Sequence, residues 1–285
     1  MDISIIIVGT NEKNHLKKCL ESIRKIKTRY SFEIIVIDNA SNDGTYEMVK
    51  NEYPEADLIR NEKKLGYIHN NITGINNTNG RYVLLLNSDI ELMPNTIEYM
   101  VDFMERTPDA AVSSSKLVFE DGTLQLTCRQ FPTPFIYLNR LPHFFRWIKS
   151  GKKFSKSQTV HKYLMLDYDH KTTRDVDWVL SALFLMRRSI IQEIGSLDNK
   201  LFQPFYLEDV EWCFRARING YKVYYIPEVY AVHYYRRDSV KKFGKLSIVH
   251  MLNILYFFSK HGLSMFLGKH KKIVNKNFLP GYQNA

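Results

Sequence analysis

Polar side chains that could bind a ligand follow several apolar runs of this 285-residue sequence. Asp38 closes one aliphatic run, and the triplet Asn87-Ser88-Asp89 closes another. The Asp38 carboxylate could accept a hydrogen bond from a nucleobase N–H or a ribose hydroxyl. The Asp-Asn-x-Ser pattern at Asp38 is also typical of a turn that caps the next helix. Residue type alone leaves both interpretations open.

Asp89 and His233 are candidate metal ligands. Mg²⁺ and Mn²⁺ prefer oxygen ligands, and a metal held by Asp89 would bridge the oxygens of a diphosphate. The alternative is that Asp89 only starts the turn into the next helix, since one carboxylate is a weak signal. His233 could add an imidazole ligand or a phosphate contact, although a lone histidine is more often packed and hydrogen-bonded.

Three acids, Glu208, Asp209 and Glu211, form a further group shortly after Phe205 and Tyr206. On a helix, Glu208 and Glu211 share a face while Asp209 points elsewhere. Acids in a first turn also interact favourably with the helix dipole. The functional alternative is that one of them is a general base, with its pKa raised by desolvation beside the aromatic rings.

The first half of the sequence alternates strand and helix patterns. Apolar runs predict strands at 3–8, 33–37, 58–60 and 82–86, and helices are expected at 16–26, 45–53, 69–77 and 95–106. Asn11 and Asn14 are expected to cap the first helix. This alternation predicts an α/β fold with a parallel, doubly wound sheet. Ligands of such sheets bind beyond the carboxyl ends of the strands, where the polar residues above would meet.

The second half has a different pattern. Expected elements are a hairpin turning at 120–122, one strand over 177–187, a helix over 209–219, a strand over 222–226 and amphipathic helices over 240–272. Residues 130–175 are basic and aromatic without a clear period, which indicates a long excursion.

The net charge of +10 is unevenly distributed. Residues 129–174 hold ten Lys and Arg against two acids, residues 236–276 hold ten against one, and the rest of the chain is acidic. Such basic segments can meet a nucleic acid, an anionic membrane or a phosphate-bearing substrate. In the tail, the apolar helix face could lie on a membrane or pack onto the rest of the protein.

The composition also indicates the cellular compartment in which the protein is expected. Three cysteines without a Cys-x-x-Cys pair give no disulfide framework and favour the reducing cytosol. The apolar runs are shorter than the roughly 20 residues of a membrane-spanning helix, and no basic region precedes the first of them, so a secretory signal is not expected.

Taken together, the segments over residues 3–239 resemble glycosyltransferase family 2, the inverting GT-A enzymes that use nucleotide sugars. The motifs that carry the resemblance are Ser4-Ile5-Ile6-Ile7-Val8, Val36-Ile37-Asp38-Asn39-Ala40-Ser41, Asn61 with Gly66-Tyr67 and Asn70-Asn71, Leu86-Asn87-Ser88-Asp89, Trp178-Val179-Leu180-Ser181-Ala182 and Glu208-Asp209-Val210-Glu211-Trp212. The resemblance implies a Rossmann-like nucleotide-binding half, a mainly parallel sheet flanked by helices, and a C-terminal helical extension.

The resemblance also implies roles for single residues. Asp38 would contact the base, Asp89 and His233 would hold Mg²⁺ or Mn²⁺, and Asp209 would be the general base that deprotonates the acceptor hydroxyl. Trp178 and Glu208 would lie on the acceptor side. The other residues expected to bind the nucleotide sugar are Thr10, Glu12, Asn61, Gly66, Asn70, Asn87 and Ser88.

The expected domain organisation is a GT-A domain over 1–239 and a basic amphipathic helical tail over 240–285. Within the GT-A domain, residues 1–107 would bind the nucleotide sugar, and residues 108–239, with the basic excursion at 130–175, would bind the acceptor.

The expected reaction is inverting and non-processive. The Gln-x-x-Arg-Trp element of processive synthases is missing, and Asn87-Ser88-Asp89 replaces the usual Asp-x-Asp. Segments such as Arg129-Gln130-Phe131-Pro132-Thr133 are closer to bacterial rhamnosyltransferase-like enzymes of surface polysaccharide assembly. The implied donor is a UDP- or dTDP-linked sugar, and the implied acceptor is a glycan or a lipid diphosphate at the inner face of the cell membrane, where the protein could make a peripheral contact.

Three alternative functions can be compared with the glycosyltransferase interpretation. A sugar nucleotidyltransferase would need a glycine-rich phosphate loop after the first strand, where Gly9-Thr10-Asn11-Glu12 offers one glycine. A catalytically silent carbohydrate- or membrane-binding protein on the same fold would not need Asp38, Asp89 and Asp209 together. Binding to nucleic acid is not expected, because the body is acidic and no recognised motif occurs.

Overall fold

The computed structural model describes residues 1–133, 136, 158–200, 207–234 and 245–266. The strands are β1 (Ile3–Gly9), β2 (Phe32–Asp38), β3 (Ala56–Arg60), β4 (Tyr82–Asn87), β5 (Ile90–Leu92), β6 (Ala110–Val118), β7 (Leu124–Gln125), β8 (Cys128–Arg129), β9 (Arg174–Val176), β10 (Trp178–Val179), β11 (Leu183–Arg187) and β12 (Lys222–His233). The helices are α1 (Lys13–Arg24), α2 (Thr45–Glu52), α3 (Tyr67–Asn76), α4 (Thr96–Arg106), α7 (Gln158–Tyr163), α8 (Arg188–Ile194), α9 (Glu208–Ile218) and α10 (Lys245–Phe266).

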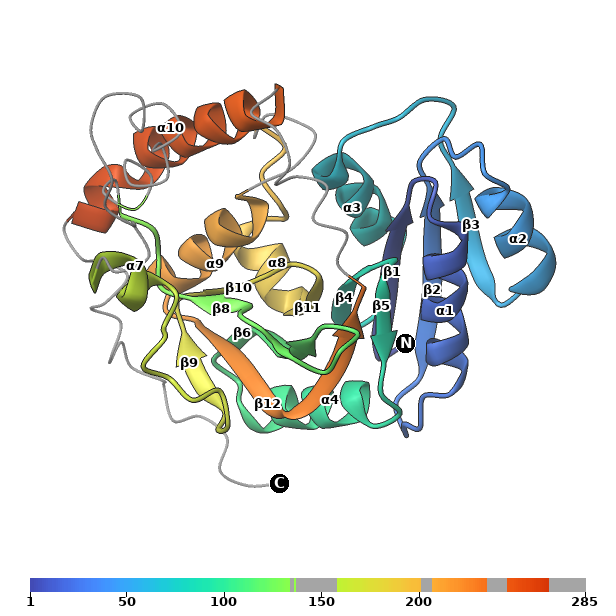
Figure 1. The fold of residues 1–285 in the computed structure, drawn as a ribbon, viewed down its shortest axis with the longest axis horizontal. Helices are drawn as coiled ribbons and strands as arrows, with labels where there is room; N and C mark the ends of the chain where they lie inside the picture. Colours follow the sequence, from blue (N-terminus) through green and yellow to red (C-terminus); the bar gives the residue numbers. More distant parts are fainter. Residues whose placement is uncertain (134–135, 137–157, 201–206, 235–244, 267–285) are drawn as a thin grey trace.

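A central mixed sheet crosses the molecule in the order β3-β2-β1-β4-β11-β6-β12-β5, with β7 beside β6 and β9 beside β12 (Figure 1). Strands β3, β2, β1 and β4 are mutually parallel, as are β6 and β12, whereas β11 runs antiparallel to both β4 and β6. The predicted α/β fold with a mainly parallel sheet is therefore confirmed. The antiparallel β11 joins the two parallel blocks.

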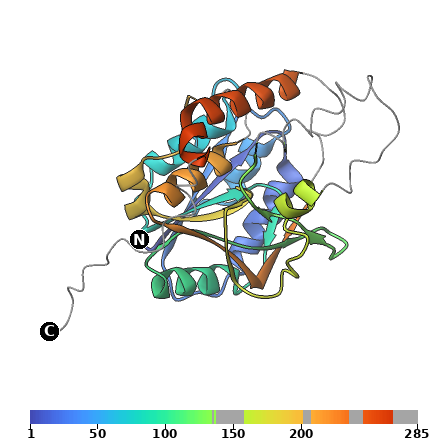
Figure 2. The ribbon, with the colours of Figure 1, turned by 90° about the vertical axis from the view of Figure 1, so that its left-hand side faces the viewer.

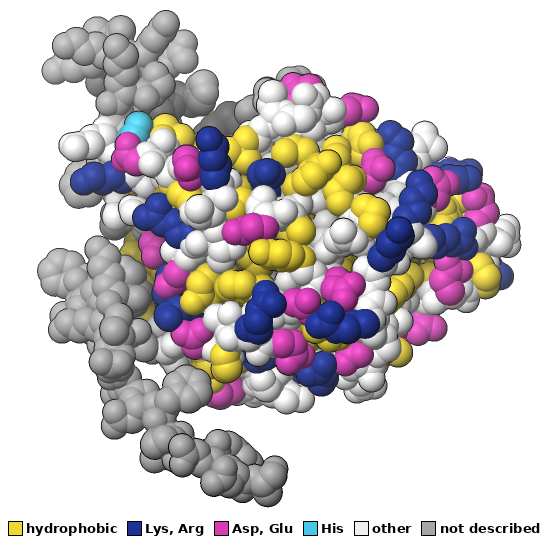
Figure 3. Space-filling model, turned by 90° about the horizontal axis from the view of Figure 1, so that it is seen from below, with side chains coloured by type: hydrophobic (Ala, Val, Ile, Leu, Met, Phe, Trp, Pro, Cys, Tyr) yellow, Lys and Arg dark blue, Asp and Glu magenta, His cyan; other side chains and the backbone are white. Residues whose placement is uncertain are grey.

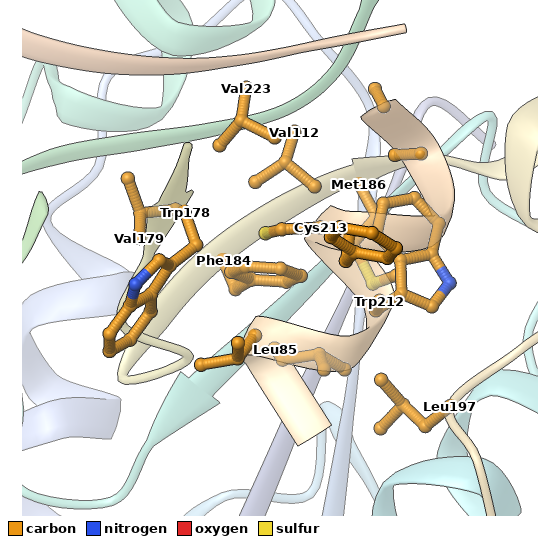
Figure 4. Close-up of a cluster of buried hydrophobic side chains, with 14 of the residues drawn as sticks. Leu85, Val112, Trp178, Val179, Phe184, Met186, Leu197, Trp212, Cys213 and Val223 are labelled. Carbon is orange, nitrogen blue, oxygen red and sulfur yellow. The ribbon is translucent and has the colours of Figure 1, made fainter. Parts of the chain in front are cut away.

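Helices cover both faces of the sheet, which explains the uninterrupted apolar strands. Successive side chains of a strand point to opposite faces, so Ile5 and Ile7 belong to the hydrophobic core that includes residues of α1, α2 and α4, while Ile6 belongs to the core on the other face, which includes residues of α3 and α9. Figure 4 shows part of the core that contains Ile6, where Trp212 and Cys213 of α9 lie near Phe184 of β11. Helix α9 is thereby packed against the sheet.

Two local predictions are wrong. The apolar segment 177–187 forms two strands, because β10 leaves the main sheet to pair with β8. The first helix is preceded by Glu12, and neither Asn11 nor Asn14 caps it. Asn11 has a positive φ of 54° and accepts a hydrogen bond through Oδ1 from the Asn42 amide at 2.8 Å. It therefore connects the loop after β1 to the loop after β2.

The hairpin predicted at 120–122 is confirmed by the β6–β7 pairing.

The predicted C-terminal helix is present as α10, which lies alongside α9 in both ribbon views (Figures 1 and 2). Phe257 of α10 is fully buried, so this helix packs on the rest of the protein through at least one face. The proposed boundary between residues 239 and 240 falls outside the described residues. No helix in the described part of the chain is long and apolar enough to cross a membrane.

The basic segments are only partly described. Much of 129–174 and of 236–276 falls in the ranges 137–157, 235–244 and 267–276, for which the structure gives no account. On the face shown in Figure 3, the described Lys and Arg side chains are interspersed with Asp and Glu.

Candidate active site

The strand register brings the predicted polar residues to one edge of the sheet. Gly9 lies opposite Asp38, and Val8 lies opposite Asn87, so β1, β2 and β4 end at the same level. Arg60, the last residue of β3, lies opposite Asp38 on the other side. The predicted meeting of strand ends is confirmed, and it follows from the parallel topology.

Asp38 is a fully buried carboxylate at this edge. Its described neighbour of opposite charge is Arg60, whose Nε lies 3.7 Å from Oδ2, and neither carboxylate oxygen accepts a hydrogen bond from a described residue. The capping interpretation is wrong, because Gly44 precedes α2 and Asp43 Oδ1 accepts the Thr45 amide hydrogen bond at 3.1 Å. A buried acceptor without such a bond is costly, which is typical of a ligand-binding group.

A cavity of about 320 Å³ lies at the carboxyl ends of β2 and β3 and is lined by Ala40, Ser41, Arg60, Asn61 and Glu62. None of the carboxylates Asp38, Asp89 and Asp209 lines it; Arg60 is the lining residue that lies next to Asp38.

Amide side chains organise the loops around this cavity. Asn61 Nδ2 donates to Asn39 Oδ1 at 3.0 Å and to Asn70 Oδ1 at 2.7 Å, and Asn39 Nδ2 donates to Thr10 Oγ1 at 3.1 Å. Gly66 precedes α3, and its carbonyl accepts the Asn70 amide. The predicted residues Thr10, Asn61, Gly66 and Asn70 therefore lie together, and their described bonds link loop to loop.

Hydrogen bonds link Asn87 and Ser88 to neighbouring loops at the sheet edge. We call the series Asn87, Tyr67 and Ser181 the polar path. Ser88 donates a hydrogen bond to the Glu12 carboxylate, which joins two predicted site residues. Tyr67 Oη lies 3.1 Å from Asn87 Oδ1 and 3.3 Å from the backbone oxygen of Ser181. Tyr67 thus connects the nucleotide-binding half to the segment that precedes β11.

Asp89 and His233 lie together, as predicted. His233 Nε2 lies 3.2 Å from Asp89 Oδ1, and the His233 ring is almost completely buried. Gln125 Oε1, 2.7 Å from Nδ1, can only accept a hydrogen bond there, which directs the Nε2 lone pair of a neutral ring toward Asp89. Two electron-pair donors this close repel each other unless a proton or a cation lies between them.

These two donors fit a divalent cation that is shared with a substrate. Among the described residues there is no group of three or more His, Cys, Asp and Glu side chains that could hold a metal. Mg²⁺ commonly uses one or two protein ligands and completes its coordination with phosphate oxygens and water. Asp89 and His233 together supply that kind of incomplete site.

Asp209 lies at the start of α9 and is linked to Asn87 through Ser181 and Tyr67. Ser181 donates its backbone N–H to Asp209 Oδ2 at 3.3 Å and its hydroxyl to Glu208 Oε1 at 3.2 Å. Both carboxylates are nearly inaccessible to solvent, and burial raises the pKa of Asp209 to about 6. A carboxylate with that pKa is suited to accept a proton near neutral pH.

The third acid of the group has a different environment. Glu211 is bonded to Arg215, Lys260 and His261 on the side of α10, so it does not share the surroundings of Glu208. Because all three acids lie in the first turn of α9, the interaction with the helix dipole applies to each of them.

Trp178 is buried, and its indole N–H donates to the backbone oxygen of Gln130 at 2.9 Å. Figure 4 shows it beside Val179 and Phe184. The Arg129 guanidinium lies 5.2 Å from the Trp178 ring centre and lowers the pKa of Asp209 against the larger effect of burial.

Five residues near the predicted groups were missed: Arg60, Tyr67, Gln125, Arg129 and Ser181. A signal was present in the sequence for Arg60, at the end of a predicted strand, and for Tyr67, Ser181 and Arg129, inside quoted motifs. Gln125 and Arg129 meet their partners only through the three-dimensional pairing of the β6–β7 hairpin and of β8 with β10.

Comparison with known proteins identifies the family of the chain. The model of the family described as "Glycosyl transferase family 2" matches residues 4–195. The chain belongs to this family and is a glycosyltransferase. An N-acetylglucosaminyl-diphospho-decaprenol L-rhamnosyltransferase of Mycobacterium tuberculosis is 23% identical over 243 residues, covering 81% of this chain and 76% of that protein. Rhamnosyltransferase WbbL of Escherichia coli is 24% identical over 286 residues, covering 97% and 96%. The resemblance to rhamnosyltransferase-like members is confirmed.

Solved structures show the same GT-A fold. GalNAc-T7 with UDP, GalNAc and Mn²⁺ superposes with a TM-score of 0.64 at 18% identity, covering 90% of this chain and 48% of that one. The mannosyltransferase PcManGT from Pyrobaculum calidifontis, in complex with GDP-Man and Mn²⁺, gives a TM-score of 0.56 at 17% identity, covering 92% and 64%. The chain thus spans less than two thirds of either solved chain.

Proposed function

We propose that the protein transfers one sugar, with inversion, from a nucleoside-diphosphate sugar to a hydroxyl of a glycan or lipid-linked glycan in cell-surface polysaccharide synthesis. The observation that carries the proposal is the polar path Asn87–Tyr67–Ser181, which joins the strand edge of Asp38 to Asp209. The named rhamnosyltransferase relatives, one of which has a diphospho-decaprenol acceptor in its name, support the sugar and acceptor class.

In this proposal each carboxylate has one role. Asp38 accepts a hydrogen bond from the base of a UDP- or dTDP-linked donor. Asp89 and His233 hold Mg²⁺ or Mn²⁺, which supplies positive charge against the diphosphate leaving group. Asp209 takes the proton of the acceptor hydroxyl, which attacks the anomeric carbon opposite the leaving group. Trp178 and Glu208 stay assigned to the acceptor side.

In this proposal the binding roles of the segments follow the predicted domains. Residues 1–107 bind the donor, residues 108–239 bind the acceptor, and residues 240–285 form the tail. A lipid diphosphate acceptor would bring the protein to the cytoplasmic face of the membrane, where Lys and Arg of the tail would contact anionic lipid.

A donor screen tests the proposal. The protein is incubated with Mn²⁺ and UDP- or dTDP-linked sugars, and free nucleoside diphosphate is measured together with the thermal shift of each mixture. Metal-dependent release of nucleoside diphosphate is expected for at least one donor. Release of pyrophosphate from a nucleoside triphosphate would instead indicate a nucleotidyltransferase, and donor binding without turnover would indicate a silent binding protein.

The pH dependence of turnover reports on Asp209. A base must be unprotonated, so kcat/KM is expected to rise about tenfold per pH unit below the Asp209 pKa of about 6 and to level off above it. The profile is obtained from initial rates between pH 4.5 and 8. A rate that stays constant down to pH 4.5 would contradict the assignment of this carboxyl.

Replacing Asp38 with Asn should affect the thermal stability of the protein and its binding of nucleotide in different ways. The change removes a buried charge, so the melting temperature of the nucleotide-free protein is expected to stay constant or to rise by about 2–4 °C. The thermal shift caused by UDP or dTDP is expected to become smaller, because a neutral amide oxygen is a weaker hydrogen-bond acceptor than a carboxylate. Asp57→Asn, at an exposed position of β3, is the control; an equal nucleotide shift in both variants would exclude Asp38 from the base site.

A further inference from the structure

A buried cluster of charges joins α10 to α9. We define the Glu211 cluster as Glu211, Arg215, Lys260, His261 and Asp198. The Glu211 carboxylate is fully buried; its Oε1 lies 2.7 Å from Lys260 Nζ and 3.0 Å from His261 Nε2, and its Oε2 lies 2.9 Å from Arg215 Nη2. Asp198 Oδ2 lies 2.6 Å from the same Lys260 ammonium.

The Glu211 carboxylate keeps its charge at working pH. Burial alone would raise the pKa of Glu211, but the hydrogen bond from His261 and the charges of Arg215 and Lys260 hold it at about 2. Apolar contacts surround the cluster, since the Phe257 ring of α10 lies 5.6 Å from the Phe214 ring of α9. Helix α10, which lies beside α9 in both ribbon views (Figures 1 and 2), is therefore fixed to it by both ionic and aromatic contacts.

The start of α9 needs such support. Leu207, which precedes the helix, has a positive φ of 73°, an unfavourable conformation for a side chain with a Cβ. Leu207 itself provides no side-chain cap, and the first-turn amide of Val210 donates instead to Asp209 Oδ1 at 2.8 Å. The first turn, which contains Asp209, is held by Ser181 from the sheet edge and by the Glu211 cluster from α10.

We propose that Glu211 is a positioning residue, and that through Lys260 and His261 it makes α10 part of the catalytic unit by fixing the orientation of the α9 turn that holds Asp209. The inference rests on the proposed role of Asp209 as the general base. Helix α10 lies outside residues 4–195, which the family model matches, so the family alone does not supply this dependence.

Lys260→Met tests the inference, because the side chain is 34% exposed and its loss should leave a folded protein. We expect kcat for nucleoside-diphosphate release with acceptor to fall roughly tenfold or more, since small displacements of a catalytic group are costly. The donor KM should stay within about twofold, because the donor contacts assigned to Asp38 and Asp89 lie elsewhere. Lys260→Arg should restore most of kcat.

Lys17→Met is the matched control, because Lys17 Nζ forms a 2.7 Å ion pair with Glu52, on the surface between α1 and α2. Its kcat should equal that of the unmodified protein. His261→Gln is a second probe of the Glu211 cluster, and rates are expressed per folded molecule, counted by UDP or dTDP binding with Mn²⁺. If both cluster variants keep the kcat of the control while Asp209→Asn is inactive, the inference fails and the proposed function stands. If Asp209→Asn is active, the proposed function fails first.

Discussion

Asp209→Asn is expected to lower kcat for sugar transfer by about 10²–10⁴-fold, the usual contribution of a general base. The substitution keeps the size of the side chain and an acceptor for the Ser181 amide, so the geometry of the α9 turn should persist. Donor binding should change little, because the base and diphosphate are assigned to the other half of the sheet edge.

The loss cannot be attributed to unfolding. The folded-state pKa of Asp209 is raised above its ordinary value of 3.8, so the native state binds this proton more tightly than the unfolded chain. The carboxylate consequently costs stability once the pH rises above about 4 and through 6, and the Asn variant should be at least as stable as the unmodified protein at pH 7.

Glu208→Gln is the comparison that identifies the base. Glu208 is the sequence neighbour of Asp209 and is similarly buried, and an amide oxygen can still accept the Ser181 hydroxyl. We expect kcat to fall by less than about tenfold in this variant. If Glu208→Gln were the inactive variant and Asp209→Asn the active one, the two roles would have to be exchanged.

Asp89→Asn is expected to lower kcat/KM by about 10²–10³-fold. A metal held by Asp89 and His233 would stabilise the developing charge on the leaving group by several kcal/mol, and each tenfold change in rate corresponds to about 1.4 kcal/mol. Asn retains one neutral oxygen, so the concentration of Mn²⁺ needed for half-maximal rate should rise, and added Mn²⁺ should restore part of the activity.

His233→Gln should show the same metal dependence with a smaller loss, because the carboxylate at Asp89 remains. Asp57→Asn again serves as a control with an exposed carboxylate. Full activity of the unmodified protein in the presence of EDTA would contradict the assignment of a metal to Asp89 and His233.

The polar residues at the edge of the sheet could be predicted because the pattern that places them there is local in the sequence. Each apolar run ends in a polar residue, and parallel strands place such ends side by side, so Asp38, Asn87 and Asp89 were expected to meet. The fold class followed from the same alternation. The antiparallel return of β11 was not expected, because the apolar segment 177–187 has no Gly or Pro to show that it breaks into β10 and β11.

The connections between the two halves depend on register that no sequence pattern reveals. Ser181 reaches Asp209 because β11 pairs Leu183 with Leu86 of β4, which places the preceding residues at the strand edge. Gln125 reaches His233 only because both β7 and β12 pair with β6. Contacts of this kind join residues that are far apart in sequence, and their partners follow from the folded sheet.

A crystal structure of the protein with UDP or dTDP and Mn²⁺ is the most direct test of the claim that three carboxylates far apart in the sequence serve one active site. The account predicts a base N–H within hydrogen-bonding distance of Asp38, and a diphosphate-bound Mn²⁺ contacting Asp89 and His233 on the side that faces Asp209. A nucleotide bound away from Asp38, or a metal without either of these ligands, would contradict it.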